Sequence, residues 1–198
     1  MRTVLLYPIL FTAFQLCWAF LWAEKHIRVR RQRNYASNRT RADTNTRYQV
    51  VSYFLFTAQN VLCIASFWLD SEILLKIHDS DAWRLVGLLL TIAATILYFK
   101  SLNHLGQNYS PCFDSHVPLE IVSSGPYRFT RHPMYLAKLL IGVANLIISG
   151  SLWFVLVFVY LALETARTIF NEEKYLATSV PDYGDYRKRT KRFIPFVF

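Results

Sequence analysis

The feature that most constrains the fold is an apolar run near the start of the chain, from Thr3 to Ala23. The run reads TVLLYPILFTAFQLCWAFLWA and contains no charged residue. An α-helix rises about 1.5 Å per residue, so this run can cross the roughly 30 Å hydrocarbon core of a bilayer. A secretory signal would have a shorter apolar stretch, of roughly 7–15 residues, followed by a small-residue cleavage site. The run therefore predicts a retained transmembrane helix.

Four further apolar segments predict the rest of a helical membrane protein: Tyr48–Leu69, Ala82–Leu102, Met134–Ile148 and Leu152–Phe170. The composition agrees, since 54% of the residues are hydrophobic and only 18% are charged. The tripeptide SGS alone separates the last two segments, so we expect them to form a tight helical hairpin. The sequence thus predicts an all-α, multi-pass transmembrane protein with five spans in one membrane domain, residues 1–198.

The distribution of charge predicts how the spans are oriented. The formal net charge is +9, and basic residues are concentrated in Glu24–Arg47 and after Phe170, whereas Asp70–Asp81 has one base, Lys76, against four acids. Lys and Arg stay on the cytoplasmic side of short loops, which predicts an N-terminus outside and a cytoplasmic C-terminus. We expect the cytoplasmic membrane of a prokaryote or the endoplasmic reticulum of a eukaryote. Orientation and anionic headgroups explain these charges better than nucleic acid, so no nucleic-acid partner is expected.

The three cysteines predict neither a metal site nor a disulfide framework. Their spacing resembles no zinc or redox motif. Cys17 and Cys63 fall inside predicted spans, where a thiol behaves as a small hydrophobe. Cys112 lies in a segment predicted to be cytoplasmic, where disulfides are rare. We therefore expect no metal.

The stretch GPYRFTRHPMY, residues 125–135, stands directly before the fourth predicted span. Pro133 suits the first turn of a helix, which places His132 near the N-cap. The free N–H groups of a helix start favour an anion, and Arg131 adds a full positive charge there. The stretch can be interpreted as an anion pocket at the membrane surface. The alternative is that its arginines are membrane anchors and His132 is a polar cap.

A second polar segment begins at the foot of the fifth predicted span. Glu164 and Arg167 are ionisable residues at or near membrane depth, which points to function. Their i,i+3 spacing also allows a purely structural ion pair. Glu172 and Glu173 follow as adjacent acids below the helix. Acids at an interface are usually just solvated, but these could receive a cationic or polyhydroxyl ligand.

The motifs of these two segments resemble those of the integral membrane methyltransferases, which comprise isoprenylcysteine carboxyl methyltransferases and phospholipid methyltransferases. The matching residues are Gly125-Pro126-Tyr127, Arg131-His132-Pro133 with Tyr135, Glu172-Glu173 with Leu176, Tyr183 with Tyr186, and Arg192 with Pro195. The stretch HLGQNYS, residues 104–110, is similar to the one that precedes this core in the carboxyl-methylating members. The resemblance covers residues 102–195, about half of the chain, which would make 102–198 the catalytic half.

The resemblance implies S-adenosylmethionine as the methyl donor, a lipophilic acceptor from the bilayer and a cytoplasmic cofactor pocket. The residues implied to bind the donor are His104, Leu105, Gly106, Gly125, Pro126, Tyr127, Arg131, His132, Pro133, Tyr135, Glu172 and Glu173. Arg167 matches an arginine that carboxyl-methylating members place at the acceptor, and Glu164 is its candidate partner. On a straight helix Arg167 and Glu172 are about 140° apart, so a shared pocket would require a bend or unwinding near Asn171.

Two acceptor chemistries and one non-catalytic function remain open. An arginine at the site favours a carboxylate acceptor of the isoprenylcysteine type, because a carboxylate is already nucleophilic. An amine acceptor, as in a phosphatidylethanolamine-type N-methyltransferase, must first lose a proton, and Glu164 could serve as the base. A membrane scaffold or carrier with the same fold is the third alternative.

Overall fold

The computed structural model describes residues 2–33, 46–68, 75–78, 80–109, 118 and 120–193. These residues form the helices α1 (Arg2–Arg33), α2 (Thr46–Ala65), α4 (Asp81–Leu105), α5 (Pro133–Ser149), α6 (Leu152–Ser179) and α7 (Tyr183–Arg189). Two short 3-10 helices, η1 (Gly106–Asn108) and η2 (Gly125–Arg128), lie between α4 and α5. The described residues contain no β-strand and only two isolated bridges, so the predicted all-α fold is confirmed.

Each of the five predicted spans corresponds to a long helix. Helices α4 and α6 are long and apolar enough, by length and composition, to cross a membrane. The other three are represented by shorter apolar helical stretches, Tyr7–Leu21, Phe54–Ala65 and Pro133–Ser149. Helix α6 extends nine residues beyond the predicted end at Phe170, so Glu172 and Glu173 lie within it rather than below it. The end of the second predicted span, at Leu69, lies outside the described residues.

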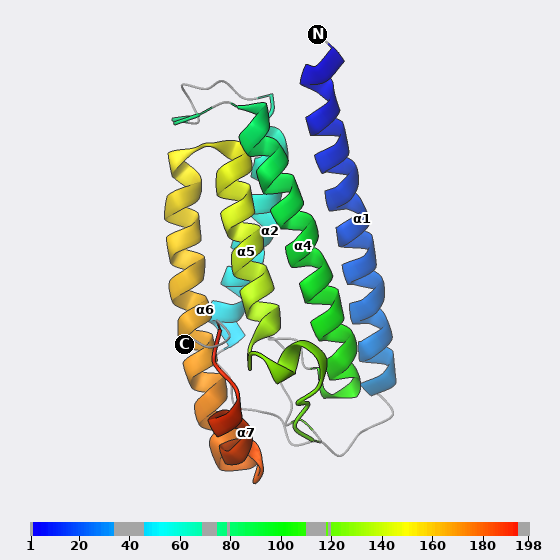
Figure 1. Ribbon diagram of the computed structural model, residues 1–198, viewed down its shortest axis with the longest axis vertical. Helices are drawn as coiled ribbons and strands as arrows, with labels where there is room; N and C mark the ends of the chain where they lie inside the picture. Colours follow the sequence, from blue (N-terminus) through cyan, green and yellow to red (C-terminus); the bar gives the residue numbers. More distant parts are fainter. Residues whose placement is uncertain are drawn as a thin grey trace.

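The five long helices form an elongated bundle in which α5 lies between α4 and α6 (Figure 1). Helix α2 packs on both α5 and α6, and α1 lies on the far side of α4. A core cluster of Phe56, Ala94, Ile141 and Leu161 joins α2, α4, α5 and α6. The bundle thus brings together helices that are distant in the sequence.

The predicted hairpin between α5 and α6 is confirmed. Gly150 ends α5 in the left-handed conformation, at φ 60°, and its N–H donates to the carbonyl of Leu146 at 2.9 Å. Ser151 follows, and α6 begins at Leu152. A residue without a Cβ adopts this φ without strain, so the SGS tripeptide reverses the chain in two residues.

A buried carboxamide network ties α1, α2 and α5 together, and the sequence analysis did not foresee it. Asn60 Oδ1 accepts from Gln15 Nε2 at 3.2 Å and from Asn145 Nδ2 at 3.1 Å. Asn60 Nδ2 donates to the carbonyl of Phe56 at 2.7 Å. All three amide side chains are at least nine-tenths buried. Separating these helices would leave buried amide groups without partners, so the bonds favour the pairing of α2 with α1 and α5.

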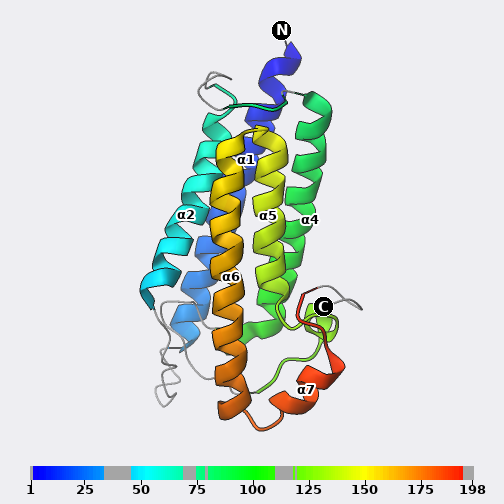
Figure 2. The same ribbon diagram turned by 90° about the vertical axis from the view of Figure 1, so that its left-hand side faces the viewer.

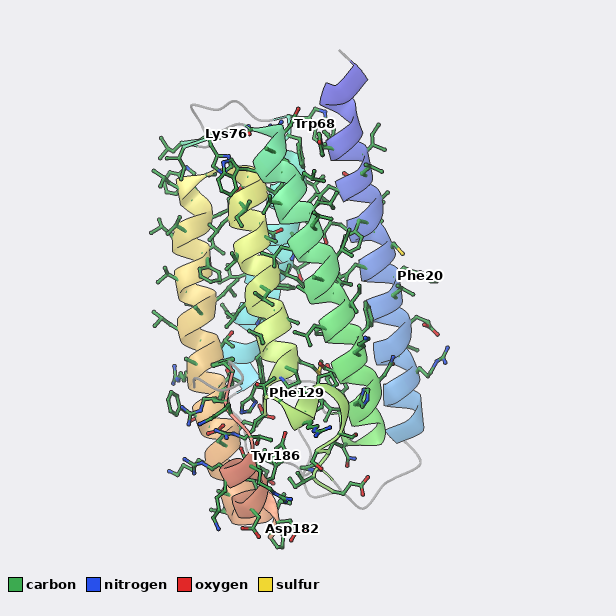
Figure 3. The ribbon with its side chains drawn as sticks, in the orientation of Figure 1. Phe20, Trp68, Lys76, Phe129, Asp182 and Tyr186 are labelled. Atoms are coloured by element: carbon green, nitrogen blue, oxygen red, sulfur yellow. The ribbon has the colours of Figure 1, made fainter. Side chains whose placement is uncertain are left out.

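The chain after α6 turns back beneath the bundle, so that α7 lies close to the loop that precedes α5 (Figure 2). The Tyr186 hydroxyl donates to the carbonyl of Tyr127 at 2.8 Å. Figure 3 shows Tyr186 and Phe129 at the same end of the bundle, opposite Trp68 and Lys76. The residues singled out from the sequence around positions 125–135 and 172–192 therefore meet at this end.

Candidate active site

The start of α5 positions the first group of candidate residues. Pro133 is the first helical residue and His132 is the N-cap, with φ −127° and ψ 53°, as the sequence predicted. The His132 side chain is buried, and its ring centroid lies 5.7 Å from that of Tyr135. Proline at this position needs no hydrogen-bond partner, so the N-cap can turn its side chain inward.

Glu173 is the centre of a buried ionic cluster formed with Arg131, His132 and Arg192. Its Oε1 lies 2.9 Å from Arg131 Nε and 3.1 Å from His132 Nε2. Its Oε2 accepts from Arg192 Nη2 at 2.8 Å and Nε at 3.2 Å. Only 4% of Glu173 is exposed. The anion predicted at the start of this helix is therefore, in this structure, a carboxylate of the protein itself.

Arg131 also fastens the C-terminal segment to the bundle. Its Nη1 donates to the carbonyl of Arg187 at 3.1 Å and to the carbonyl of Thr190. Its backbone N–H donates to the carbonyl of Lys191 at 2.8 Å. The hydroxyl of Thr130 donates to the carbonyl of Arg192 at 2.7 Å. Three consecutive carbonyls, at residues 190–192, are thus bound by residues directly preceding α5.

Glu172 differs from Glu173 in its hydrogen bonding. Its Oε2 is buried and has no hydrogen-bond partner within the described part of the chain, and the same is true of the Tyr183 hydroxyl. Burial raises the pKa of Tyr183, and the negative charge of Glu173 raises it further. Burial also raises the pKa of Tyr127, with a second contribution from the charge of Glu172. Burial also raises the pKa of Tyr186 to about 12. These phenols stay protonated at neutral pH, so Tyr183 offers a neutral donor beside two carboxylates.

The two glycine-containing motifs meet at this end of the bundle. The His104 ring, in the last turn of α4, lies directly against Gly125 at the start of η2. Its Nδ1 is 2.7 Å from the carbonyl of Lys100. Gly125 has φ 57°, and a Cβ there would collide with the imidazole. Leu105 and Gly106 continue from His104, and Pro126 and Tyr127 from Gly125, so both motifs border the same end of the bundle.

Arg167 and Glu164 are not brought to the ionic cluster. Arg167 Nη1 lies 3.7 Å from Glu164 Oε1, and the Arg167 side chain is 51% exposed. Helix α6 continues without interruption from Leu152 to Ser179, so it is not unwound at Asn171. At 100° per residue, Arg167 lies about 120° around the helix from Glu173. The shared pocket considered from the sequence therefore does not form through a break in α6.

Sequence reasoning did not place Tyr183, Tyr186, Arg192 or Thr130 in the site. The first three belong to the terminal motif that carried the resemblance, which was the available signal. Their contribution depends on α7 returning to the loop before α5, and local sequence patterns do not specify that return. Thr130 had no signal of its own.

Comparison with known proteins agrees with this arrangement. Residues 83–182 match the family model described as phospholipid methyltransferase. The chain is 35% identical over 77 residues to the cobalt-zinc-cadmium resistance protein CzcN of Cupriavidus metallidurans, covering 38% of this chain and 35% of that protein. It is 32% identical over 78 residues to the nickel-cobalt-cadmium resistance protein NccN of Alcaligenes xylosoxydans xylosoxydans, covering 38% of this chain and 36% of that protein. These matches thus span about a third of each relative's length.

The fold is also similar to that of a solved structure, the eukaryotic intramembrane Ras methyltransferase ICMT, an isoprenylcysteine carboxyl methyltransferase. The TM-score is 0.52 at 20% identity, over 76% of this chain and 51% of that one. This likeness concerns the fold alone. The family model, in contrast, matches half of the chain and includes most of α4 and all of η2, α5 and α6. It covers Arg131, His132 and Glu173 of the ionic cluster, whereas Arg192 lies beyond it. The chain therefore belongs to the phospholipid methyltransferase family.

Proposed function

We propose that this protein transfers a methyl group from S-adenosylmethionine to a lipophilic acceptor in the membrane. The observation that carries the proposal is the pair of buried, unpartnered oxygens of Glu172 and Tyr183, found in the described structure beside the Glu173 cluster. Burying such atoms without partners costs about 1–3 kcal/mol each. Glu172 lies within the family match, residues 83–182, and Tyr183 directly follows it. A site that bears this cost is suited to a polar ligand.

The chemistry of the donor fits these residues. An amino group or ribose hydroxyls would complete the hydrogen bonding of Glu172 and Tyr183. The other proposed donor-binding residues are His104, Leu105, Gly106, Gly125, Pro126, Tyr127, Arg131, His132, Pro133, Tyr135 and Glu173. The donor supplies a methyl group activated by its sulfonium centre. The protein's task is to orient the two substrates and exclude water, and the hydrogen-bonded cluster around Glu173 supports that task.

Donor binding can be tested with S-adenosylhomocysteine, the demethylated product. It should raise the melting temperature of the purified protein, because a ligand selective for the folded state stabilises that state. Glu172→Gln and Tyr183→Phe should each reduce the shift, since each alters a group proposed to bind the donor. Both changes should leave the melting temperature of the ligand-free protein nearly unchanged. Wild-type shifts in both variants would exclude this location for the donor.

For the acceptor we propose first a carboxylate of the isoprenylcysteine type, with Arg167 binding it and Glu164 as the partner of Arg167. The likeness to the fold of an isoprenylcysteine carboxyl methyltransferase supports the preference for a carboxylate acceptor. The alternative is the amine of a phosphatidylethanolamine-type lipid, which the family description supports. Offering both acceptors in parallel with labelled donor separates the two, and label found in phospholipid alone would reject the carboxylate.

We further propose that all five long helices cross the membrane, with the N-terminus outside and the site on the cytoplasmic side. The two ends of the bundle then face different compartments, with Ser80 at one end and α7 at the other. A tag inserted at Ser80 and a tag after Phe198 should be reachable only from opposite sides of the membrane. Labelling of both tags from the same side in sealed vesicles would contradict this topology.

A further inference from the structure

Thr165, on α6, carries a buried hydroxyl that the functional proposal above does not use. Only 3% of the residue is exposed, and its Oγ1 has no hydrogen-bond partner among the described residues. Hydroxyls inside helices often bond to a backbone carbonyl three or four residues earlier. Thr91 does so with the carbonyl of Gly87 at 2.8 Å, and Ser101 with that of Leu97 at 2.7 Å. The hydroxyl of Thr165 makes no such bond, so its oxygen can bind a ligand.

Thr165 lies on the same face of α6 as Glu172, whose Oε2 is also buried without a partner in the described structure. Glu172 follows Thr165 by seven residues, and at about 100° per residue their directions differ by only about 20°. Ile169, which lies between them in the sequence, is 0% exposed, so this face is turned into the bundle. Helix α6 begins at Leu152, at the end of the bundle opposite α7, so Thr165 is nearer the middle of the bundle than Glu172 (Figure 1).

A donor that binds Glu172 is long enough to reach Thr165. The two residues are about 10.5 Å apart along the helix axis. A hydrogen bond to the Glu172 carboxylate takes up about 3 Å, and a C–H···O contact with the Thr165 hydroxyl about 3.5 Å. About 4 Å then remains. In S-adenosylmethionine a short chain of carbon atoms joins the sulfonium both to the amino group and to the ribose, and either chain covers that remainder.

We propose that the Thr165 hydroxyl oxygen contacts the sulfonium methyl group of the donor and orients it toward the membrane. This inference rests on the proposed function and deepens it, since it assigns the reacting end of the donor site. The positive sulfur makes the methyl hydrogens partly positive, and a buried hydroxyl oxygen accepts weak C–H···O bonds from them. A neutral hydroxyl is a weak nucleophile, so Thr165 orients the methyl group without receiving it.

Comparing the donor with its product tests the methyl contact separately from the rest of the site. S-adenosylmethionine and S-adenosylhomocysteine differ only in the methyl group and the positive charge on sulfur. The whole chain is reconstituted in phosphatidylcholine nanodiscs, which contain neither candidate acceptor, and titration calorimetry measures the Kd of each ligand. Thr165→Val removes the hydroxyl, and Thr165→Ser keeps it.

Thr95→Val is the matched control. Thr95 is 9% exposed, and its hydroxyl likewise has no partner within the described part of the chain. It lies on α4, however, and α5 separates α4 from α6 (Figure 1). The two valine variants therefore remove the same kind of buried hydroxyl at different places in the bundle.

Thr165→Val should weaken binding of S-adenosylmethionine about two- to fivefold and leave the Kd of S-adenosylhomocysteine unchanged. Thr165→Ser and Thr95→Val should bind both ligands as the wild type does. Unchanged binding of S-adenosylmethionine by Thr165→Val would overturn the inference, and so would an equal loss for both ligands.

The same titrations separate this outcome from failure of the functional proposal. If the wild type binds neither ligand, the donor site is rejected and the role of Thr165 with it. If the wild type binds both and Thr165→Val shows no selective loss, only the role of Thr165 is rejected. The melting temperatures of ligand-free Thr165→Val and Thr95→Val should equal or exceed that of the wild type, because each change removes a buried hydroxyl without a partner.

Discussion

Replacing Glu173 with glutamine should lower the free energy of unfolding by about 3–5 kcal/mol, because it leaves buried cations without their counter-charge. In the native protein the carboxylate receives four hydrogen bonds, from Arg131, His132 and Arg192. A neutral amide cannot replace them, since its NH₂ group would face guanidinium and imidazole donors. Thermal unfolding of the variant in detergent or nanodiscs measures the effect.

The neighbouring acid provides the matched control. Glu172→Gln removes the same charge one residue earlier in α6, but the Oε2 of Glu172 has no hydrogen-bond partner in the described ranges. We therefore expect Glu172→Gln to change the free energy of unfolding by less than about 0.5 kcal/mol while weakening donor binding. Equal destabilisation by the two changes would contradict the role of Glu173 as the centre of the cluster.

Replacing Asn60 with leucine should cost about 1–3 kcal/mol of stability. Leucine is similar in shape to asparagine but lacks the oxygen that accepts from Gln15 and Asn145. Both donors would then be buried without a partner. Because these bonds join α1 and α5 to α2, we expect α1 in particular to separate more easily. The melting temperature and the rate of proteolysis after α1 measure the two effects.

Gln59, adjacent to Asn60, is the control for this change. It is 1% exposed, and neither of its amide atoms has a hydrogen-bond partner among the described residues. Gln59→Leu removes a buried polar group that gains nothing from the fold, so stability should stay the same or rise. A loss from Gln59→Leu as large as that from Asn60→Leu would show that the network does not account for the cost.

The sequence predicted the helices well because their signals are local. Long apolar runs indicated the positions of the five helices, and Pro133 and Gly150 marked where α5 begins and ends. The end of α6 was wrong, because the charged residues after Phe170 suggested that the helix had ended. The carboxylate of Glu173 is paired with the guanidinium groups of Arg131 and Arg192 and contacts the ring of His132, so this charged residue can lie buried within the helix.

The candidate site was predictable only in part. The motifs placed Arg131, His132 and Glu173 among the residues expected to bind the donor. They did not predict that Arg131 and His132 both contact the Glu173 carboxylate, as the structure shows. The N–H groups at the start of a helix favour any anion. The sequence motif therefore did not reveal that the anion is the carboxylate of Glu173. Arg192 and Tyr183 depend on the return of α7, which is a tertiary event.

Methyl transfer from labelled S-adenosylmethionine tests the central claim most directly. Membranes containing the wild-type protein are incubated with the labelled donor, and label is counted in the lipid-extractable fraction. Membranes containing Glu172→Gln, inserted to the same level, provide the reference. The account predicts label in a lipophilic product with the wild type and a large reduction with Glu172→Gln. Equal labelling of the two membranes, at the level of membranes without the protein, would contradict it.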